Sequence, residues 1–163
     1  MSAASTGSAP GRGYNRGVSR YYRLDEANAA LPDLVPVIDR LREQRRELMI
    51  LRDAWSERAG AAIDELPPEP AAADEHPDLR ILRLRMRGLV DQMAADVAWF
   101  DERGIVLRDI ETGLLDFATL AEGRQVWLCW RSGETEVAWW HTTSEGFANR
   151  RPLDALPGPA ASA

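Results

Sequence analysis

The sequence predicts an α+β fold: a long antiparallel helical hairpin, coiled-coil-like, followed by a small antiparallel β-sheet of three to four strands. Apolar residues recur at helical spacing through two long segments before Gly104. After Gly104 the apolar period changes to two, and the chain becomes rich in tryptophan and β-branched residues. The 163 residues, 45% of them hydrophobic and 28% charged, have the size and composition of one globular domain.

The helical hairpin is predicted from two apolar stripes. A seven-residue repeat from Leu34 to Trp55 predicts a helix over about residues 34–59. A second stripe, with alternating steps of three and four residues, predicts a helix over about 78–103; its members are Leu79, Leu82, Met86, Leu89, Met93, Asp96 and Phe100. Neither helix buries its stripe alone, so the two are expected to pack antiparallel. Asp96 on the second stripe then needs a polar partner.

A shorter helix is predicted before the hairpin. Residues 25–31 favour a helix, and Pro32 is expected to end it because proline disfavours helical geometry in the residue before it. Asp33 is then a candidate N-cap for the helix at 34–59. The proline- and alanine-rich segment 60–77 is predicted to be a loop between the two long helices.

The C-terminal part of the chain is predicted to form the sheet. Strands are expected over about residues 105–110, 114–117, 124–131 and 136–142. A two-residue turn beginning at Gly133 would join the last two strands, because glycine readily adopts the positive φ of such turns. This register pairs Trp127 with Trp140. It also leaves Cys129 opposite Ala138.

One domain is expected over residues 21–153, between two tails. Residues 1–20 and 154–163 lack periodicity and are rich in small residues, so both are predicted to be disordered. Residues 1–24 carry four arginines and no acid, whereas the whole chain has a net charge of −6. This acidic body argues against nucleic-acid binding, because neutralising phosphates requires clustered positive charge.

Composition disfavours several classes of protein. No run approaches the roughly 20 apolar residues of a membrane span, and the first residues lack the apolar segment of a secretory signal. Cys129 is the only cysteine, which excludes internal disulfides and a cysteine-based zinc cluster. We therefore expect a cytoplasmic protein with no membrane contact, no metal and no cofactor.

The tryptophans form the first candidate surface. Trp127, Trp130, Trp139 and Trp140 lie within fourteen residues and fall on both faces of one predicted hairpin. Burial is the commoner role of aromatic residues, so one face is expected to pack on the helices. The alternative is that one face binds a ligand or partner, since tryptophan is enriched where binding energy concentrates.

His141 is the main candidate for chemistry, because the other histidine, His76, lies in the predicted loop. A hydrogen-bonding role at the end of a strand is the simpler interpretation. The alternative pairs His141 with Asp116, Glu145 or Asp109 as an acid–base or metal site. One histidine with carboxylates is a small ligand set for zinc, which usually takes three or four protein ligands, so no metal site is predicted.

Cys129 and two arginines complete the set of candidates. Cys129 is expected to be a buried, unreactive thiol, because reactive cysteines need an accessible, electropositive setting. Arg150 and Arg151, close to Phe147, carry forked donors that suit a carboxylate or phosphate, although a solvated pair is the simpler interpretation. No motif of useful specificity assigns a catalytic residue.

The most distinctive residues lie at the two ends of the predicted domain. They are Tyr22-Arg23-Leu24-Asp25-Glu26-Ala27-Asn28 at the start and Leu115-Asp116-Phe117, GRQVWLCWR (123–131), EVAWWH (136–141), Gly146-Phe147 and RRPL (150–153) at the end. Together they resemble a bacterial family known as a domain of unknown function, number twenty-two-oh-three, from about Tyr21 to Leu153. The resemblance implies an α+β protein with no established reaction, cofactor or partner. The loop at 60–77 departs from the simpler family pattern.

The leading hypothesis is a non-enzymatic protein-interaction module. Ile81 and Leu84 lie off the predicted seam of the second long helix and would be exposed in a lone hairpin. The hairpin would therefore form a homo-oligomer or bind a partner protein, with the tryptophan-rich sheet as a second contact surface. The alternative is a small-ligand-binding protein or enzyme with one pocket around His141, Trp139, Trp140 and Arg150. A weaker third hypothesis has residues 1–24 binding nucleic acid.

Overall fold

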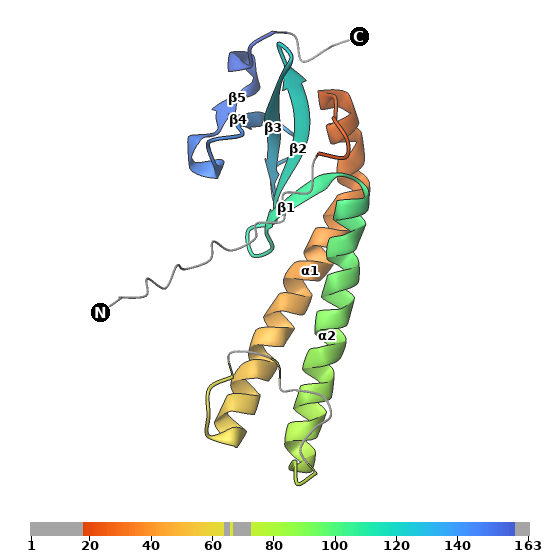
Figure 1. Cartoon of the computed structure of the whole chain (residues 1–163), viewed down its shortest axis with the longest axis vertical. Coiled ribbons are helices and arrows are strands. Elements are labelled where there is room, and N and C mark those ends of the chain that lie inside the picture. The colour runs from red at the N-terminus through yellow and green to blue at the C-terminus, as the bar shows by residue number, and fades with distance from the viewer. Residues whose placement is uncertain (1–17, 64–65, 67–72, 159–163) are drawn as a thin grey trace, which may run out of the picture.

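The computed structural model describes residues 18–63, 66 and 73–158. Two long helices, α1 (Leu24–Ala59) and α2 (Pro77–Glu102), pack against each other, and a five-stranded antiparallel sheet follows them. Figure 1 shows the sheet beside the first turns of α1, at one end of the helical hairpin. The rest of the hairpin extends away from the sheet, and we call residues 46–59 and 77–90 the arm. The predicted α+β class is confirmed, with one strand more than the three to four expected.

α1 is one continuous helix, so the predicted break between 25–31 and 34–59 is wrong. Pro32 and Pro36 both lie inside it. A proline in a helix interior costs about 3 kcal/mol, since it cannot donate to the carbonyl four residues earlier. Burial of the neighbouring side chains offsets this cost, because each fully buried leucine or isoleucine contributes about 1.5–3 kcal/mol. The buried neighbours, none more than 8% exposed, are Ala27, Leu31, Leu34, Val37 and Ile38.

The sheet has the simple order β1-β2-β3-β4-β5. Its strands are β1 (Ile105–Asp109), β2 (Leu114–Ala121), β3 (Arg124–Arg131), β4 (Trp139–Thr142) and β5 (Arg151–Pro152), and two 3-10 helices, η1 (Phe147–Asn149) and η2 (Leu153–Ala155), follow β4. β5 is only two residues long, and no sequence period can be read over so short a segment. The strand is formed by pairing with β4 rather than by local preference.

The predicted register between β3 and β4 is wrong by one residue. The observed Cα partners are Trp127–His141, Leu128–Trp140 and Cys129–Trp139. Residues 132–138 form a longer connection in place of the tight hairpin predicted at Gly133. The cause lies in Val137, whose N–H donates to Oδ1 of Asn28 in α1 at 2.8 Å instead of to β3. A shift of one residue moves every side chain of a strand to the opposite face relative to its neighbour.

The sheet consequently has a helix side and an outer face. Side chains on the helix side pack with α1 in the main core; they are Leu115, Phe117, Leu128, Trp130 and Trp140. The outer face carries the alternate residues Asp116, Ala118, Trp127, Cys129, Trp139 and His141. Two of the four clustered tryptophans are therefore core residues, and Trp127 and Trp139 lie on the outer face.

The two helices contact each other through the predicted stripes. In the arm a separate small core is formed by Leu51, Leu82, Met86 and Leu89. Asp96 accepts hydrogen bonds from Nε and a terminal nitrogen of Arg40, at 2.9 and 2.5 Å. The polar partner expected for Asp96 is thus present. Within the described residues, neither helix is apolar over a long enough stretch to cross a membrane.

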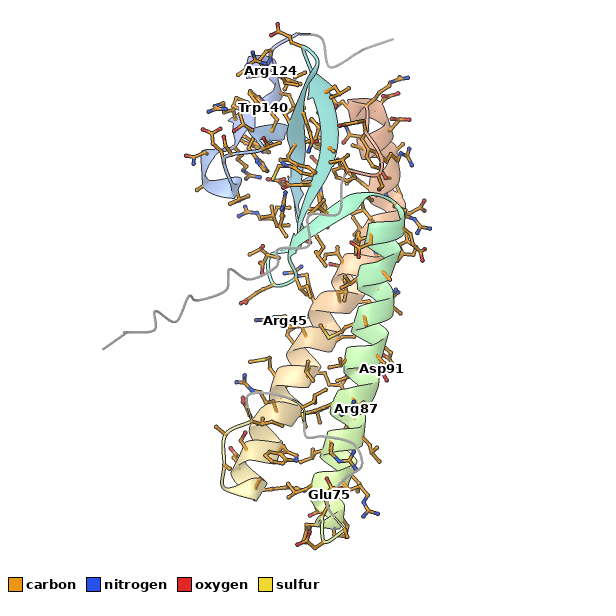
Figure 2. All side chains as sticks on the ribbon, in the orientation of Figure 1. Arg45, Glu75, Arg87, Asp91, Arg124 and Trp140 are labelled. Atoms are coloured by element: carbon orange, nitrogen blue, oxygen red, sulfur yellow. The ribbon has the colours of Figure 1, made fainter. Side chains whose placement is uncertain are left out.

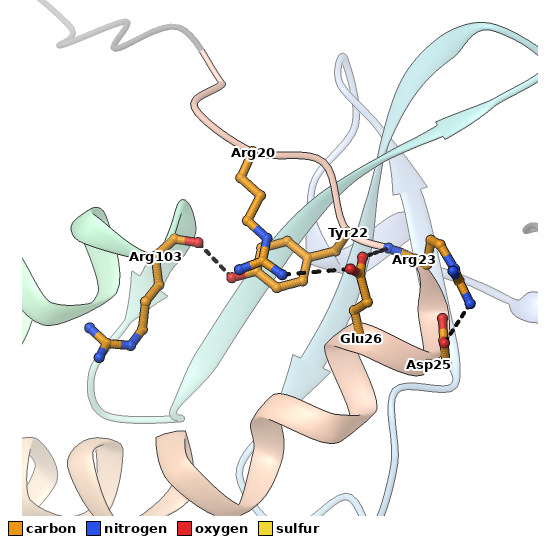
Figure 3. A network of polar contacts seen from close by, with 6 residues as sticks. All are labelled: Arg20, Tyr22, Arg23, Asp25, Glu26 and Arg103. Atoms are coloured by element: carbon orange, nitrogen blue, oxygen red, sulfur yellow. Dashed lines mark hydrogen bonds and ion pairs between the residues drawn. The ribbon is translucent and has the colours of Figure 1, made fainter.

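Residues 20–28, which we call the latch, fasten the start of α1 to the rest of the molecule (Figure 3). The Tyr22 N–H donates to the carbonyl of Ala118 at 2.7 Å, and the Tyr22 hydroxyl donates to the carbonyl of Arg103 at 2.5 Å. Burial raises the pKa of Tyr22 above its ordinary value, against the opposing charges of Arg20 and Arg103. The Glu26 carboxylate accepts a hydrogen bond from the backbone N–H of Arg23, the N-cap residue of α1, at 2.8 Å. The distinctive opening residues therefore have a structural role.

The described chain extends past the predicted domain ends. Most of the two predicted disordered tails, residues 1–17 and 159–163, lies outside the described residues. Residues 154–158 were expected to be disordered. Leu156 instead packs in the main core and anchors this segment against the sheet domain.

Candidate functional site

The outer face of the sheet brings together three side chains that can titrate or bind a metal: Asp116 from β2, Cys129 from β3 and His141 from β4. Asp116 and Cys129 are Cα partners, and His141 is paired with Trp127, two residues from Cys129. One ligand atom from each lies within 4.8 Å of the others. Their exposed fractions are 1%, 0% and 3%. We call these three residues the buried cluster.

The hydrogen bonds of His141 determine its protonation. Nδ1 lies 2.9 Å from the carbonyl oxygen of Thr142, and Nε2 lies 3.0 Å from Oδ2 of Asp116. A carbonyl oxygen only accepts, so Nδ1 carries a proton, and a neutral ring then has a lone pair at Nε2. That lone pair would face a carboxylate oxygen, so a proton must lie between the two atoms. Burial acts to lower the pKa of His141, but the hydrogen bond and charge of Asp116 raise it above the ordinary value.

One carboxylate oxygen of Asp116 accepts hydrogen bonds, and the other has no hydrogen-bond partner among the described residues. Oδ2 accepts from His141 and also from Nε of Arg108, at 2.7 Å. Oδ1 is buried and has no hydrogen-bond partner among the described residues. The Arg108 side chain is 40% exposed and lies over the Trp127 ring at 4.9 Å, so it reaches from solvent to the buried carboxylate. Sequence reasoning missed Arg108, although strand alternation places it two residues from Val106, the Cα partner of Asp116.

Cys129 is buried, as the sequence predicts. Burial raises its pKa to about 12, with a further contribution from the charge of Asp116 and an opposing one from Arg150. The thiol is therefore protonated at neutral pH. Both ring nitrogens of His141 are occupied by other groups, so His141 is not placed to remove the thiol proton. The arrangement does not support a cysteine nucleophile.

Arginine and aromatic side chains cover the outer face around the buried cluster. The Arg150 guanidinium lies 4.7 Å from the Trp139 ring centre and 4.4 Å from that of Phe147. It also contacts a carboxylate oxygen of Glu134 at 2.6 Å. Arg151 contacts a glutamate as well, Glu145, at 2.9 Å. The two arginines considered as anion ligands are thus each paired within the chain.

The four residues of the predicted ligand pocket lie on two faces of the sheet. Trp140 is in the main core, where its Nε1 donates to the carbonyl of Pro152 at 3.1 Å. Trp139, His141 and Arg150 are on the outer side, where His141 is buried. The one-residue shift of register causes this separation. A cavity of about 230 Å³ beside Trp127 includes none of these four residues; it is lined by Val18, Ser19, Asp101, Gly104, Ile105, Val106, Ala118 and Trp127.

The remaining predicted contact residues lie on the arm. Ile81 and Leu84 are 57% and 53% exposed, and Ile50 on α1, which sequence reasoning missed, is 68% exposed. Trp130, the last candidate, is a core residue whose Nε1 donates to the carbonyl of Glu134 at 3.0 Å.

Comparison with known proteins gives a family but no reaction. No curated protein and no solved structure matches the chain. A family model described as "Uncharacterized conserved protein (DUF2203)" matches residues 20–153, which include the latch, both long helices and the sheet through β5. The match covers most of the 163 residues. The chain therefore belongs to the DUF2203 family of uncharacterized conserved proteins.

Proposed function

We propose that this chain is a protein-interaction module that self-associates through the side of α2 turned away from α1. The observation that carries the proposal is the exposure of Ile81 and Leu84 on that side. Single exposed apolar residues are common and need no explanation. These two are distinguished by the pattern of residues that continues from them along the helix.

Ile81 and Leu84 begin a regular stripe along α2. The α2 stripe consists of Ile81, Leu84, Gly88, Asp91, Ala95 and Ala98. Steps of three and four residues alternate along it, which is the spacing of a coiled-coil contact. At 100° per residue it lies opposite the buried contact with α1 made by Leu82, Met86 and Leu89. Figure 2 labels Asp91, which belongs to this stripe, and Arg87, one helical turn before it.

Side-chain size along the stripe favours an antiparallel second copy. The stripe has large residues at its start and small ones at its end. A two-fold axis between Gly88 and Asp91 would place Ile81 over Ala98 of the second copy. The same axis would place Leu84 over Ala95. Large side chains then fill the space left by small ones, as close packing requires.

Charge along α2 favours the same arrangement. Four arginines precede Gly88 and four acids follow it: Arg80, Arg83, Arg85 and Arg87, then Asp91, Asp96, Asp101 and Glu102. Antiparallel pairing brings the basic half of one copy to the acidic half of the other, whereas parallel pairing would oppose like charges. Several of these charges already pair within the chain: Arg80 and Arg83 with Glu75, Arg85 with Glu47, and Asp96 with Arg40. Charge along α2 would therefore contribute mainly to the orientation of the two copies.

The outer face of the sheet adds less to this proposal. Arg108 and Arg150 already lie over Trp127 and Trp139. The ligand-binding alternative has no comparable support among the described residues, because its four residues lie on two faces.

The mass of the particle in solution tests the proposal. By light scattering the wild type is expected at twice 18.2 kDa, and the double variant Ile81→Glu, Leu84→Glu at the mass of one chain. Ile50→Glu is the matched control, because Ile50 is more exposed than either residue and lies on the arm, but on α1, so this variant should stay dimeric. A wild type that remains monomeric at its highest soluble concentration would refute the proposal.

A further variant tests the antiparallel geometry. Ala95→Glu introduces a charge opposite Leu84 of the second copy and should also dissociate the dimer. If Ala95→Glu stays dimeric while the Ile81/Leu84 variant dissociates, the two copies meet in some other arrangement.

A further inference from the structure

We infer that Asp116, Cys129 and His141 bind a divalent transition metal ion of the zinc class. The three donors are a carboxylate, a thiol and an imidazole, contributed by three adjacent strands and gathered within 4.8 Å. Thiolate and imidazole ligands suit Zn²⁺, Co²⁺ and Fe²⁺, whereas Mg²⁺ and Ca²⁺ take oxygen ligands. This site is independent of the proposed self-association, since it lies in the sheet and not on α2.

The orientation of His141 is that of a metal ligand. Histidines that bind metals usually donate the other ring N–H to a carbonyl or carboxylate, which fixes the tautomer. Here Nδ1 donates to the carbonyl of Thr142 at 2.9 Å, and Nε2 is directed to Oδ2 of Asp116 at 3.0 Å. Nε2 of a neutral ring and a carboxylate oxygen both accept, so the pair needs either a proton shared between them or a metal ion that both atoms bind.

A proton on Nε2 would satisfy the contact with Oδ2 of Asp116. It would not provide a hydrogen-bond partner for the other carboxylate oxygen, Oδ1. Oδ1 is buried and lacks a hydrogen-bond partner among the described residues. A buried, unsatisfied polar atom destabilises a protein by about 1–3 kcal/mol, and more when it is charged. A metal ion in the buried cluster would contact this carboxylate and the imidazole together, and the thiol of Cys129 lies beside them.

The distances leave room for an ion. Ligand atoms at about 2.0–2.3 Å from a tetrahedral zinc ion lie roughly 3.3–3.7 Å from one another. The His141–Asp116 separation of 3.0 Å is slightly shorter, and no separation in the cluster exceeds 4.8 Å, about 1 Å longer. Three protein ligands leave a fourth position open, a common arrangement for zinc outside purely structural sites.

The charges of the site also balance. A metal-bound cysteine is deprotonated, and a metal-bound ring nitrogen carries no proton. Binding therefore releases to solvent both the thiol proton and the proton held between Nε2 of His141 and Asp116, and it forms a metal–sulfur and a metal–nitrogen bond. The thiolate and the Asp116 carboxylate then carry two negative charges against the two positive charges of the ion. Arg108 keeps its hydrogen bond to Oδ2 and would orient the carboxylate from outside the metal's ligands.

Cobalt provides a direct test, because Cys129 is the only cysteine in the chain. The untagged full chain is unfolded and refolded with one equivalent of Co²⁺, so that burial of the site does not prevent entry. We expect one Co²⁺ per chain and a sulfur-to-cobalt charge-transfer absorption, which only thiolate ligation produces. Zn²⁺ should abolish the absorption by displacing cobalt. A refolded wild type, with native circular dichroism, that lacks this absorption would overturn the inference.

Variants identify the ligands. His141→Gln should weaken Co²⁺ binding by more than about 100-fold, since loss of an outer partner alone typically costs 10–100-fold. His76→Gln is the matched control, because it removes the other histidine, at the start of α2, and should bind as the wild type does. An unchanged cobalt spectrum in folded His141→Gln would exclude the proposed site. If that variant does not fold, the wild-type spectrum still decides. The Ile81→Glu, Leu84→Glu double variant should bind cobalt normally.

Discussion

Asn28→Ala tests the contact that we hold responsible for the register of β4. Oδ1 of Asn28 accepts the Val137 N–H at 2.8 Å, and Val137 is 1% exposed, so the N–H loses its acceptor at a site that is open to water only from the side of Asn28. A buried backbone N–H without a partner destabilises the fold by about 1–3 kcal/mol. Alanine recovers about 0.5 kcal/mol through its higher helix propensity. The expected net loss is about 1.5 kcal/mol, or roughly 3–6 °C in Tm for a chain of this size.

Urea unfolding followed by tryptophan fluorescence measures this loss. Asn28→Asp keeps an oxygen acceptor at the same position and should stay closer to the wild type than Asn28→Ala does. Glu43→Ala, an exposed change elsewhere in α1, should lie within about 0.5 kcal/mol of the wild type. Hydrogen exchange adds a local readout, because the Val137 amide should exchange faster in Asn28→Ala.

One result would refute the reasoning. If Asn28→Ala is as stable as the wild type and the Val137 amide still exchanges slowly, the hydrogen bond does not set the register. Packing of the Val137 side chain against the helix would then be the cause.

Three further predictions follow from the packing. Because the folded-state pKa of Tyr22 lies above 10.0, its contribution to stability is complete below pH 10 and is lost as the pH rises above that value. Tyr22→Phe should lower the free energy of unfolding by about 1 kcal/mol at neutral pH. It should also reduce the fall in stability above pH 10, as measured by urea unfolding at a series of pH values. Gly113→Ala should destabilise by at least about 1 kcal/mol, because φ is +64° and a new Cβ would lie 2.7 Å from Cβ of Ser132; a melting curve equal to wild type would contradict the strain. Asp96→Leu should raise stability by about 1 kcal/mol, since it extends the apolar seam and leaves a half-exposed Arg40 free to hydrate; a lower Tm would show that the ion pair is worth more than the added apolar contact.

Features that depend on local periodicity could be predicted from the sequence. The two apolar stripes led to both long helices, and the exposure of Ile81 and Leu84 followed from their place outside the second stripe. β3 was predicted at its observed bounds, because its residues favour a strand wherever they occur. The need of Asp96 for a partner followed from its place on an apolar seam.

Features that depend on distant residues could not. Pro32 favours the end of a helix, but burial of its neighbours against the sheet keeps α1 continuous. The register of β4 depends on Asn28, which precedes Val137 by 109 positions. In the predicted register Cys129 and His141 lie on opposite faces, so the buried cluster could not be recognised. His141 had three candidate carboxylates, and only the observed register selects Asp116.

The latch has a consequence for the order in which the molecule is made. Tyr22 bonds to Arg103 and Ala118, and Asn28 bonds to Val137. A ribosome therefore releases all of α1 well before it has synthesised the groups that α1 contacts. Until β4 emerges, the apolar side of the first turns of α1 has no sheet to cover it. The helical arm can fold during translation, but the contacts between the start of α1 and the sheet form only after β4 has been synthesised.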